Sequence, residues 1–266
     1  MKIRFLNQKN RSLMREMVSA DFKVRYQGSI LGYAWSLLKP LFMFAILYIV
    51  FVKFLKIGSD IPHYPIYLLL GIVIWNFFGE LTTQGLNSIV SHGDLIRKVK
   101  IPRWLIVAST SMSALINFGL NLIVIIVFML INQVDLSWRL LLLPFNFAEV
   151  YLLGFGISLL LSAAYVKYRD LSSIWDIVLQ AGFYVTPIFY PLSMITNDTV
   201  QKLLLLNPMA QAIQDARYNA VTTETVRLQD LVSGWKVLIP YIIVIFVVYF
   251  GARYFKKQSK YFAENL

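Results

Sequence analysis

Residues 104–131, WLIVASTSMSALINFGLNLIVIIVFMLI, form the stretch that decides the fold of this chain. It contains no Asp, Glu, Lys or Arg. A helix needs about 20 predominantly apolar residues to cross the hydrocarbon core of a bilayer. The stretch therefore predicts a membrane-spanning helix, and the rest of the chain has to be interpreted with lipid as its main solvent.

The composition and five further apolar runs support this interpretation. Of the 266 residues, 58% are hydrophobic and 15% are charged, whereas a soluble domain carries about 25% charged residues. The absence of cysteine excludes thiol chemistry, and two histidines are too few for a zinc centre. Together with 104–131, the runs 33–55, 66–90, 140–166, 171–193 and 237–255 predict an all-α integral membrane protein with six transmembrane helices. Pro187 and Pro191 should kink or end the fifth.

The charge distribution predicts the orientation. With both termini in the cytoplasm, seventeen Lys and Arg residues lie on the inner side and seven on the outer side, as the positive-inside rule requires. This topology accounts for most of the net charge of +11, so nucleic-acid binding loses its main support. We divide the chain into a cytoplasmic N-terminus (1–32), a six-span transmembrane domain (33–255) and a cytoplasmic tail (256–266).

Three segments outside the spans have helical or amphipathic patterns. Residues 12–27 predict an amphipathic helix on the inner membrane surface, or alternatively a soluble lead-in that packs on a partner. The inner loop 91–103, SHGDLIRKVKIPR, is either a plain basic loop or a short helix that docks in a groove of a cytoplasmic protein. The outer segment 194–235 predicts two short apolar helices, separated by Asn207-Pro208, that border a passage.

Ionisable residues inside predicted spans are candidates for function. Glu80 belongs to a polar stripe at helical spacing, which either lines a pathway or pairs helices. Glu149 and Asp176 also fall within predicted spans, and Lys39 is placed where its side chain would reach the inner interface. No phosphate-binding loop, dinucleotide fingerprint or hydrolase motif occurs. The sequence therefore predicts no catalytic residue and no metal site, and the energy for transport must come from another polypeptide or an ion gradient.

The order of several short motifs resembles a known family. RYQGSILGYAW at 25–35 is followed by Lys39-Pro40, KIP at 100–102, YRD at 168–170, TPI at 186–188 and Asn207-Pro208. This order resembles the transmembrane permease subunit of bacterial ABC exporters for lipid-linked polysaccharides, which handle O-antigens, teichoic acids, capsules and rhamnose-rich polymers. The resemblance runs through essentially the whole chain.

The resemblance implies a homodimer in the bacterial cytoplasmic membrane, with each subunit docked on one copy of a separate ATPase that binds ATP and Mg. The chain itself would bind no cofactor, and its substrate would be a lipid-linked glycan. The implied ATPase-coupling residues are Ser91, Asp94, Arg97, Lys98, Lys100, Arg169 and Asp170. The candidate channel residues are Phe42, Tyr48, Glu80, Phe183, Tyr184 and Tyr190. The implied outer gate holds Asn207, Pro208 and Gln211, and the interface helix holds Arg15, Met17, Lys23 and Arg25.

Three alternatives remain open at the level of sequence. A permease of the same architecture would export a drug or another lipid. A secondary carrier would show inverted repeats with broken helices in both halves, but only the fifth span is broken by proline. A membrane glycosyltransferase would need a catalytic base, for which Glu80 and Asp176 are available, but no phosphate-binding or metal motif accompanies them.

Overall fold

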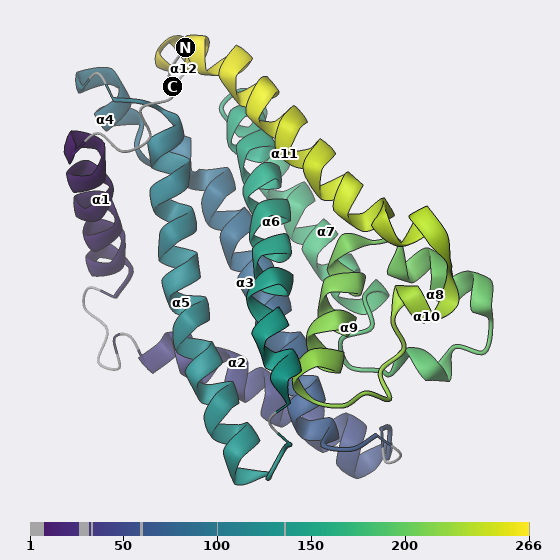
Figure 1. Cartoon of the computed structure of the whole chain (residues 1–266). Helices are drawn as coiled ribbons and strands as arrows, with labels where there is room; N and C mark the ends of the chain where they lie inside the picture. Colours follow the sequence, from purple (N-terminus) through teal and green to yellow (C-terminus); the bar gives the residue numbers. More distant parts are fainter. Residues whose placement is uncertain are drawn as a thin grey trace.

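The computed structural model describes residues 8–26, 32, 34–58, 61–99, 101–135 and 137–265. Within these residues the chain is built from helices and contains no β-strand (Figure 1), which confirms the predicted all-α class. The elements are α1 (Gln8–Tyr26), α2 (Ala34–Leu47), η1 (Tyr48–Phe54), α3 (Tyr64–Ser91), α4 (Gly93–Lys98), α5 (Trp104–Ile131), η2 (Trp138–Leu142), α6 (Leu143–Tyr165), α7 (Leu171–Val185), η3 (Leu192–Met194), α8 (Asp198–Leu205), α9 (Pro208–Ala220), α10 (Leu228–Leu231), η4 (Gly234–Leu238), α11 (Ile239–Gln258), η5 (Ser259–Tyr261) and α12 (Phe262–Asn265).

Five stretches of the described chain are long and apolar enough to cross a membrane: Ala34–Phe54, Tyr64–Ser91, Trp104–Ile131, Trp138–Tyr165 and Gly234–Tyr261. The fifth predicted span, 171–193, is not among them, because α7 ends at Val185 after 15 residues. Such a helix is about 22 Å long, whereas the hydrocarbon core is about 30 Å thick. A proline disfavours helical backbone at the residue before it, and Thr186, before Pro187, is extended. The predicted count of six spanning helices is therefore not confirmed.

Helix α3 forms the centre of the bundle. It packs against α5, α6, α7 and α9 (Figure 1), and Ile66, Ile72 and Leu81 on it are fully buried. Inside a bilayer, burial of such side chains stabilises the bundle through close packing rather than through removal from water. The burial of α3 means that most of its side chains contact protein, which permits it to carry polar residues at membrane depth.

Helices α6 and α11 approach each other most closely at two glycines. A Cβ atom added to Gly251 would collide with the carbonyl oxygen of Gly156, and one added to Gly156 would meet the backbone of Val248. Small residues allow helix backbones to approach in this way inside membranes, where close packing drives association. The crossing holds α11 against α6, and the two helices together form one wall against which α9 packs.

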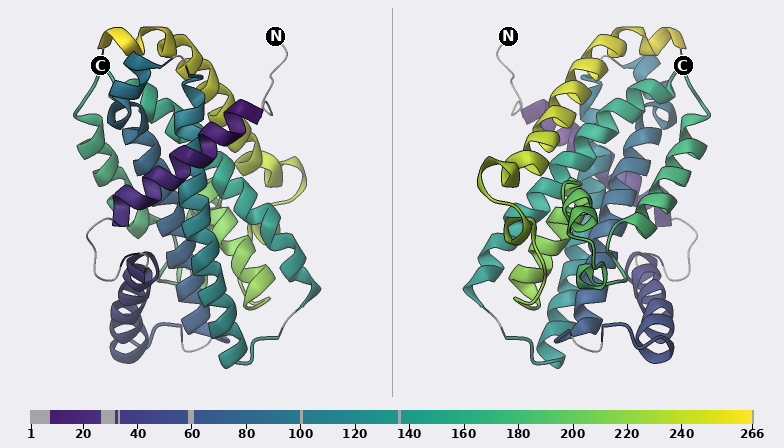
Figure 2. Two further views of the ribbon diagram at one scale, coloured as in Figure 1. Left: turned by 90° about the vertical axis from the view of Figure 1, so that its left-hand side faces the viewer. Right: turned by 90° about the vertical axis from the view of Figure 1, so that its right-hand side faces the viewer.

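A second apolar core lies at the end of the bundle that carries α4 and α12 (Figure 1). Met17 of α1, Ile96 of α4, Phe255 of α11 and Phe262 of α12 belong to it. Helix α1 lies against α5 (Figure 2). Its Met17 is buried, whereas Arg15 and Lys23 are exposed; the side chain of Arg25 lies outside the described residues.

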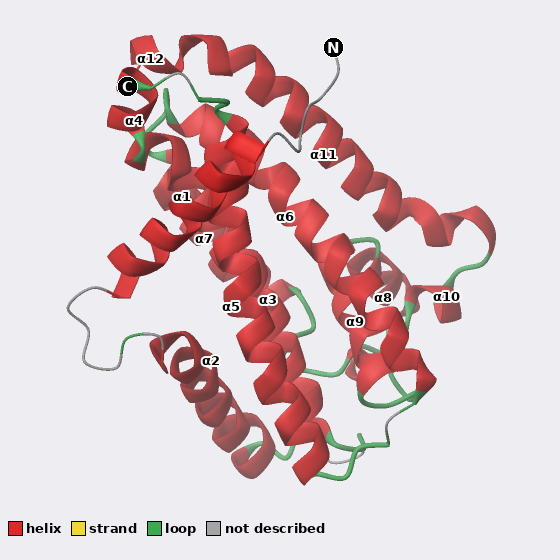
Figure 3. Cartoon of the chain, turned by 60° about the vertical axis from the view of Figure 1, so that its left-hand side comes forward, coloured by secondary structure: helices red, strands yellow, loops and turns green. Residues whose placement is uncertain are grey.

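Among the helices of the predicted spans, α2 and α7 bury the fewest residues. Pro40 is the only buried residue that the structure describes on α2, and no residue of α7 is buried. Figure 3 shows α2 at the edge of the bundle, beside α5. Large apolar side chains such as Phe42, Ile46, Ile174 and Ile177 are exposed on these two helices. These faces must be covered by lipid or by another polypeptide, because apolar patches of this extent are not left in water.

Candidate functional site

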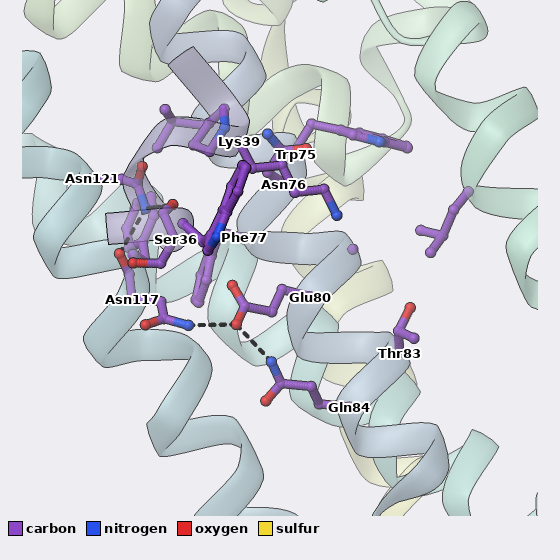
Figure 4. A pocket seen from close by; sticks show the side chains of 16 residues that line it. Ser36, Lys39, Trp75, Asn76, Phe77, Glu80, Thr83, Gln84, Asn117 and Asn121 are labelled. Carbon is purple, nitrogen blue, oxygen red and sulfur yellow. Dashed lines mark hydrogen bonds between the residues drawn. The ribbon is translucent and has the colours of Figure 1, made fainter. Parts of the chain in front are cut away.

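A cavity of about 570 Å³ lies between α2, α3 and α5, with Leu179 of α7 at its edge. Figure 4 shows polar side chains from three helices directed toward it. Its lining residues are Trp35, Ser36, Lys39, Pro40, Val73, Trp75, Asn76, Phe77, Gly79, Glu80, Thr83, Gln84, Asn117, Phe118, Asn121 and Leu179. The volume is that of a typical small-molecule site, and its depth within the spanning helices makes its polarity unusual.

Glu80 is the centre of the polar network in this cavity. Its Oε1 accepts hydrogen bonds from Nε2 of Gln84 and Nδ2 of Asn117, each at 2.6 Å (Figure 4). Gln84 is one helical turn away on α3, and Asn117 reaches across from α5. Hydrogen bonds to an ionised carboxylate are short and about twice as strong as neutral ones. The network therefore ties α3 to α5 and orients the carboxylate.

The side of the cavity formed by α5 also contains a hydrogen-bond acceptor that is not used. Asn117 is 2% exposed, and its Oδ1 has no hydrogen-bond partner among the described residues. Asn121, one turn further on α5, donates to the carbonyl oxygen of Ser36 at 3.3 Å and so connects α5 to α2. Trp35 is 48% exposed beside these groups. Amides, a carboxylate and flat aromatic rings together suit a ligand that presents both hydroxyl groups and apolar faces.

Of the channel residues predicted from sequence, only Glu80 lines this cavity. Phe183, Tyr184 and Tyr190 instead gather at the end of α7, around Phe189. Tyr190 also donates a hydrogen bond to the carbonyl oxygen of Val185 at 2.8 Å. The predicted aromatic residues of the fifth span therefore form one cluster next to the cavity rather than its lining.

The two predicted aromatic residues of the first span, Phe42 and Tyr48, are not the ones that join this cluster; the first span reaches it through Phe51, whose ring centroid lies 4.7 Å from that of Phe189. Tyr48 packs against Phe44, with ring centroids 5.7 Å apart, and the ammonium of Lys53 lies over its ring. Phe42 is 57% exposed. Trp75 makes the link between cavity and cluster, because it lines the cavity and its ring lies 6.3 Å from that of Phe183.

Sequence reasoning missed several residues of the cavity. Asn117 and Asn121 are four residues apart in a stretch without charged residues, so they share one helix face. A polar pair at that spacing within a predicted span was the signal that could have identified them. Lys39, expected at the inner interface, also lines the cavity.

At the opposite end from the α2–α3 connection, the loop 91–103 contains the short helix α4. Ile96 is buried in the second core, whereas Asp94, Arg97 and Lys98 are exposed, as is Ser91. Lys100 lies outside the described residues. Arg169 and Asp170 are also exposed, in the turn after α6, which Figure 2 shows at this same end. The predicted coupling residues that the structure describes are thus exposed side chains at one end of the molecule.

A polar contact connects this loop to α1. Nε2 of His92 lies 3.5 Å from Oδ1 of Asp21, and its Nδ1 lies 2.9 Å from the carbonyl oxygen of Ser88. The hydrogen bond with Asp21 is the main cause that raises the pKa of His92 above its usual value near 6.5, against the opposing effect of burial. The charged imidazole can donate from both ring nitrogens, so this form suits both contacts.

Helices α8 and α9 occupy the segment where an outer hairpin was predicted. Asn207 caps α9, since its Oδ1 accepts from the backbone N–H of Met209 at 3.0 Å, and Pro208 takes the first helical position, where it is favoured. Helix α9 is buried against α3, α6 and α11, and Gln211 is 2% exposed.

Arg217 fastens α9 to the rest of the bundle, a role that sequence reasoning did not identify. Its side chain is fully buried. It donates to the carbonyl oxygens of Tyr67 at 3.0 Å and Pro187 at 2.6 Å, and also to that of Ile188. The guanidinium lies 3.7 Å from the ring centroid of Tyr67. Within the described residues Arg217 has no acidic partner, and several hydrogen bonds and a stacked ring satisfy the buried charge instead.

Comparison with known proteins identifies the family to which this arrangement belongs. Residues 12–221 match the model of the ABC-2 type transporter family. The chain belongs to this family. An ABC-2 transporter is a membrane protein, in agreement with the five long apolar helices, and the family resemblance seen in the order of motifs is confirmed.

Among its relatives, the chain is similar to O-antigen export system permease proteins named RfbA. The one from Myxococcus xanthus is 29% identical over 83% of this chain and 83% of its own length. One from Klebsiella pneumoniae is 29% identical over 96% of this chain and 95% of its own length. The polysialic acid transport protein KpsM of Escherichia coli is more distant, 21% identical over 74% of this chain and 76% of its own.

Proposed function

We propose that this ABC-2 transporter is the permease subunit of an ATP-driven exporter that moves lipid-linked polysaccharide outward across the bacterial cytoplasmic membrane. The observation that carries the proposal is its similarity to O-antigen export permeases over 96% of its length. The cavity around Glu80 adds independent support, because its chemistry suits hydroxyl-rich ligands with apolar faces. The termini would lie in the cytoplasm, in accord with the positive-inside distribution of charge.

The proposed exporter is a homodimer, and the path for the glycan runs between the subunits. Helices α2 and α7 bear exposed apolar faces in a single chain, and a twin subunit would cover part of them. The aromatic cluster around Phe189 lies at the end of α7, where the flat rings would contact the C–H faces of passing sugars. Phe42 and Tyr48 of the first span would face the same path.

The power for export would come from a separate ATPase, bound on the cytoplasmic side with its own ATP and Mg. Helix α4 fits the docking role, since it is anchored through Ile96 and exposes Asp94, Arg97 and Lys98. Arg169 and Asp170 would contact the same partner. The hairpin of α8 and α9, with Asn207, Pro208 and Gln211, would form the outer gate.

The proposal is tested by deleting the gene in its host and measuring glycan at the cell surface. We expect lipid-linked glycan to accumulate inside the cell and export to return on complementation. Glu80→Gln should lower the export rate about tenfold, since it replaces the charge-assisted hydrogen bonds from Gln84 and Asn117 by neutral ones, a loss of about 1.5 kcal/mol in total. Asn87→Ala, an exposed change on the same helix, is the matched control.

Two results would contradict this assignment. Unchanged surface glycan in the deletion strain would show that the substrate is a drug or another lipid. Export that continues without any ATPase and follows an ion gradient would indicate a secondary carrier.

A further inference from the structure

Two carboxyl groups meet where α9 packs against α6 and α11 (Figure 1). Glu149 comes from the second turn of α6 and is 5% exposed. Asp215 comes from α9, one turn after Gln211. The Glu149 carboxyl faces both Asp215 and the Gln211 side chain. This cluster is separate from the cavity around Glu80, and none of its members lines that cavity.

Gln211 bridges the cluster. Its Nε2 donates to Oδ2 of Asp215 and to the hydroxyl oxygen of Tyr241 on α11, the latter at 2.9 Å. Both amide hydrogens are thereby used. Gln211 can therefore offer Glu149 no more than a share of an N–H that is already engaged, and its remaining polar atom, Oε1, can only accept.

Three acceptor atoms in the cluster lack a partner. Both carboxyl oxygens of Glu149 and Oε1 of Gln211 are without a hydrogen-bond partner among the described residues. An ionised carboxylate offers acceptors only, so charged Glu149 would leave all three unsatisfied. A buried polar group without a hydrogen bond is costly, and a buried charge without a partner is far more costly.

The surrounding charges do not neutralise Glu149. Arg227 exerts an attraction on Asp215, but its guanidinium contacts Asp230 at 3.2 Å and lies 3.4 Å from the ring centroid of Tyr218. Asp230 and Tyr241 are the other titratable groups that act on the pair. The charge that acts on Glu149 is therefore the like charge of Asp215.

We propose that Glu149 is a proton-binding site that controls the docking of α9. While α9 is packed against α6, the carboxyl is protonated and donates its hydrogen to Oε1 of Gln211, so that donor and acceptor satisfy each other. Release of this proton leaves a carboxylate beside Asp215, and the repulsion between the two charges loosens α9 from α6. The inference concerns contacts within the chain and does not depend on which molecule is exported.

The protonation of Glu149 is tested by infrared spectroscopy of the full chain in lipid nanodiscs. We expect a carbonyl stretch of a protonated carboxyl group at neutral pH in the wild type, which disappears in Glu149→Gln. Glu224→Gln, at an exposed position after α9, is the matched control and should keep the band. The inference is overturned if the wild type lacks the band, or if Asp215→Asn rather than Glu149→Gln removes it. The wild-type spectrum decides the first point even if a variant does not fold.

The docking of α9 is tested with a single cysteine, since the chain contains none of its own. Ala216→Cys places a thiol at a fully buried position of α9, and Leu203→Cys at a 64% exposed position of α8 reports the pH response of a free thiol. The maleimide-labelling rate at position 216 divided by the rate at position 203 should rise with pH. This ratio should stay constant with pH when Glu149→Gln is added. A ratio with the same pH dependence in both backgrounds would overturn the inference. So would a ratio that follows sodium concentration at constant pH, because it would indicate a metal cation in place of the proton.

Discussion

At the scale of single residues, Arg217 shows how a charge is buried without a counter-ion. Its guanidinium distributes donors to carbonyl oxygens of α3 and of the turn after α7. Lysine has a compact ammonium in place of the planar fork, so it cannot reproduce this geometry. We expect Arg217→Lys to lower the free energy of unfolding by about 1–3 kcal/mol for each carbonyl left unpaired.

The measurement is thermal unfolding of the purified protein, together with hydrogen exchange of peptides from α9. Arg253→Lys, the same change at an exposed position of α11, should leave both unchanged. If Arg217→Lys has no larger effect than Arg253→Lys, the fastening role assigned to Arg217 is wrong.

The contact between His92 and Asp21 should make stability depend on pH. The pKa of His92 is raised in the folded protein, mainly by the hydrogen bond with Asp21. The contact therefore contributes fully below the unfolded pKa of about 6.5, and this contribution is lost as pH rises through the folded pKa. The difference in melting temperature between the wild type and His92→Gln should shrink over that range. A difference that stays constant with pH would contradict this role for His92.

At the scale of helices, the crossing of α6 and α11 makes a sharp prediction. Gly251→Ala forces a methyl group onto the backbone of Gly156, and overpacking of this kind costs about 1–3 kcal/mol. Gly119→Ala on α5 meets no atom within 4 Å, and alanine there should stabilise the helix by up to about 1 kcal/mol. The free energy of unfolding in detergent should fall for Gly251→Ala and rise for Gly119→Ala, each relative to the wild type. Equal effects would indicate that the crossing is looser than described.

The proposed role of α4 in docking the ATPase is tested by reversing the charges that it exposes. The double change Arg97→Glu and Lys98→Glu alters only exposed side chains and leaves the anchor Ile96 in place. We expect the permease to fold but to lose co-purification with its ATPase, because charge complementarity steers such contacts. Lys256→Glu, also exposed, is the control. Retention of the ATPase by the double variant would exclude α4 as its docking element.

The sequence predicts a feature well when the residues that define it lie within one helix, and poorly when the feature depends on contacts between helices. The span 104–131 coincides with α5, because an uncharged run bounded by Arg103 and Asn132 leaves little choice. The break predicted at Pro187 within the run 171–193 ends α7 at Val185, and because the helix before it has only 15 residues, a sixth span is not confirmed. The cavity required contacts between α3 and α5, which no periodicity within one helix reveals. Glu80 was identifiable because a charged residue inside a span is energetically costly, and Asn117 through its spacing from Asn121, but the contact between Glu80 and Asn117 was not.

At the scale of the whole molecule, the proposed homodimer predicts which faces touch the twin subunit. Ile177 on α7 and Ile245 on α11 are both 67% exposed. In the cysteine-free chain, Ile177→Cys should form a disulfide between subunits on mild oxidation, whereas Ile245→Cys, facing lipid, should not. Cross-linking is measured on non-reducing gels of membranes. Preferential cross-linking at Ile245 would place the subunit contact on α11 instead.

The central position of α3 has a consequence for biosynthesis. Its mean hydropathy of 1.5 is the lowest of the five long apolar stretches, because it carries Glu80 and its amide neighbours. Such a segment partitions weakly into lipid when alone, since each charged group near the bilayer centre opposes insertion. We therefore expect α3 to be held at the translocon until α5 and α6 have emerged from the ribosome. A nascent chain that stops before α6 should be recognised by membrane quality-control proteases.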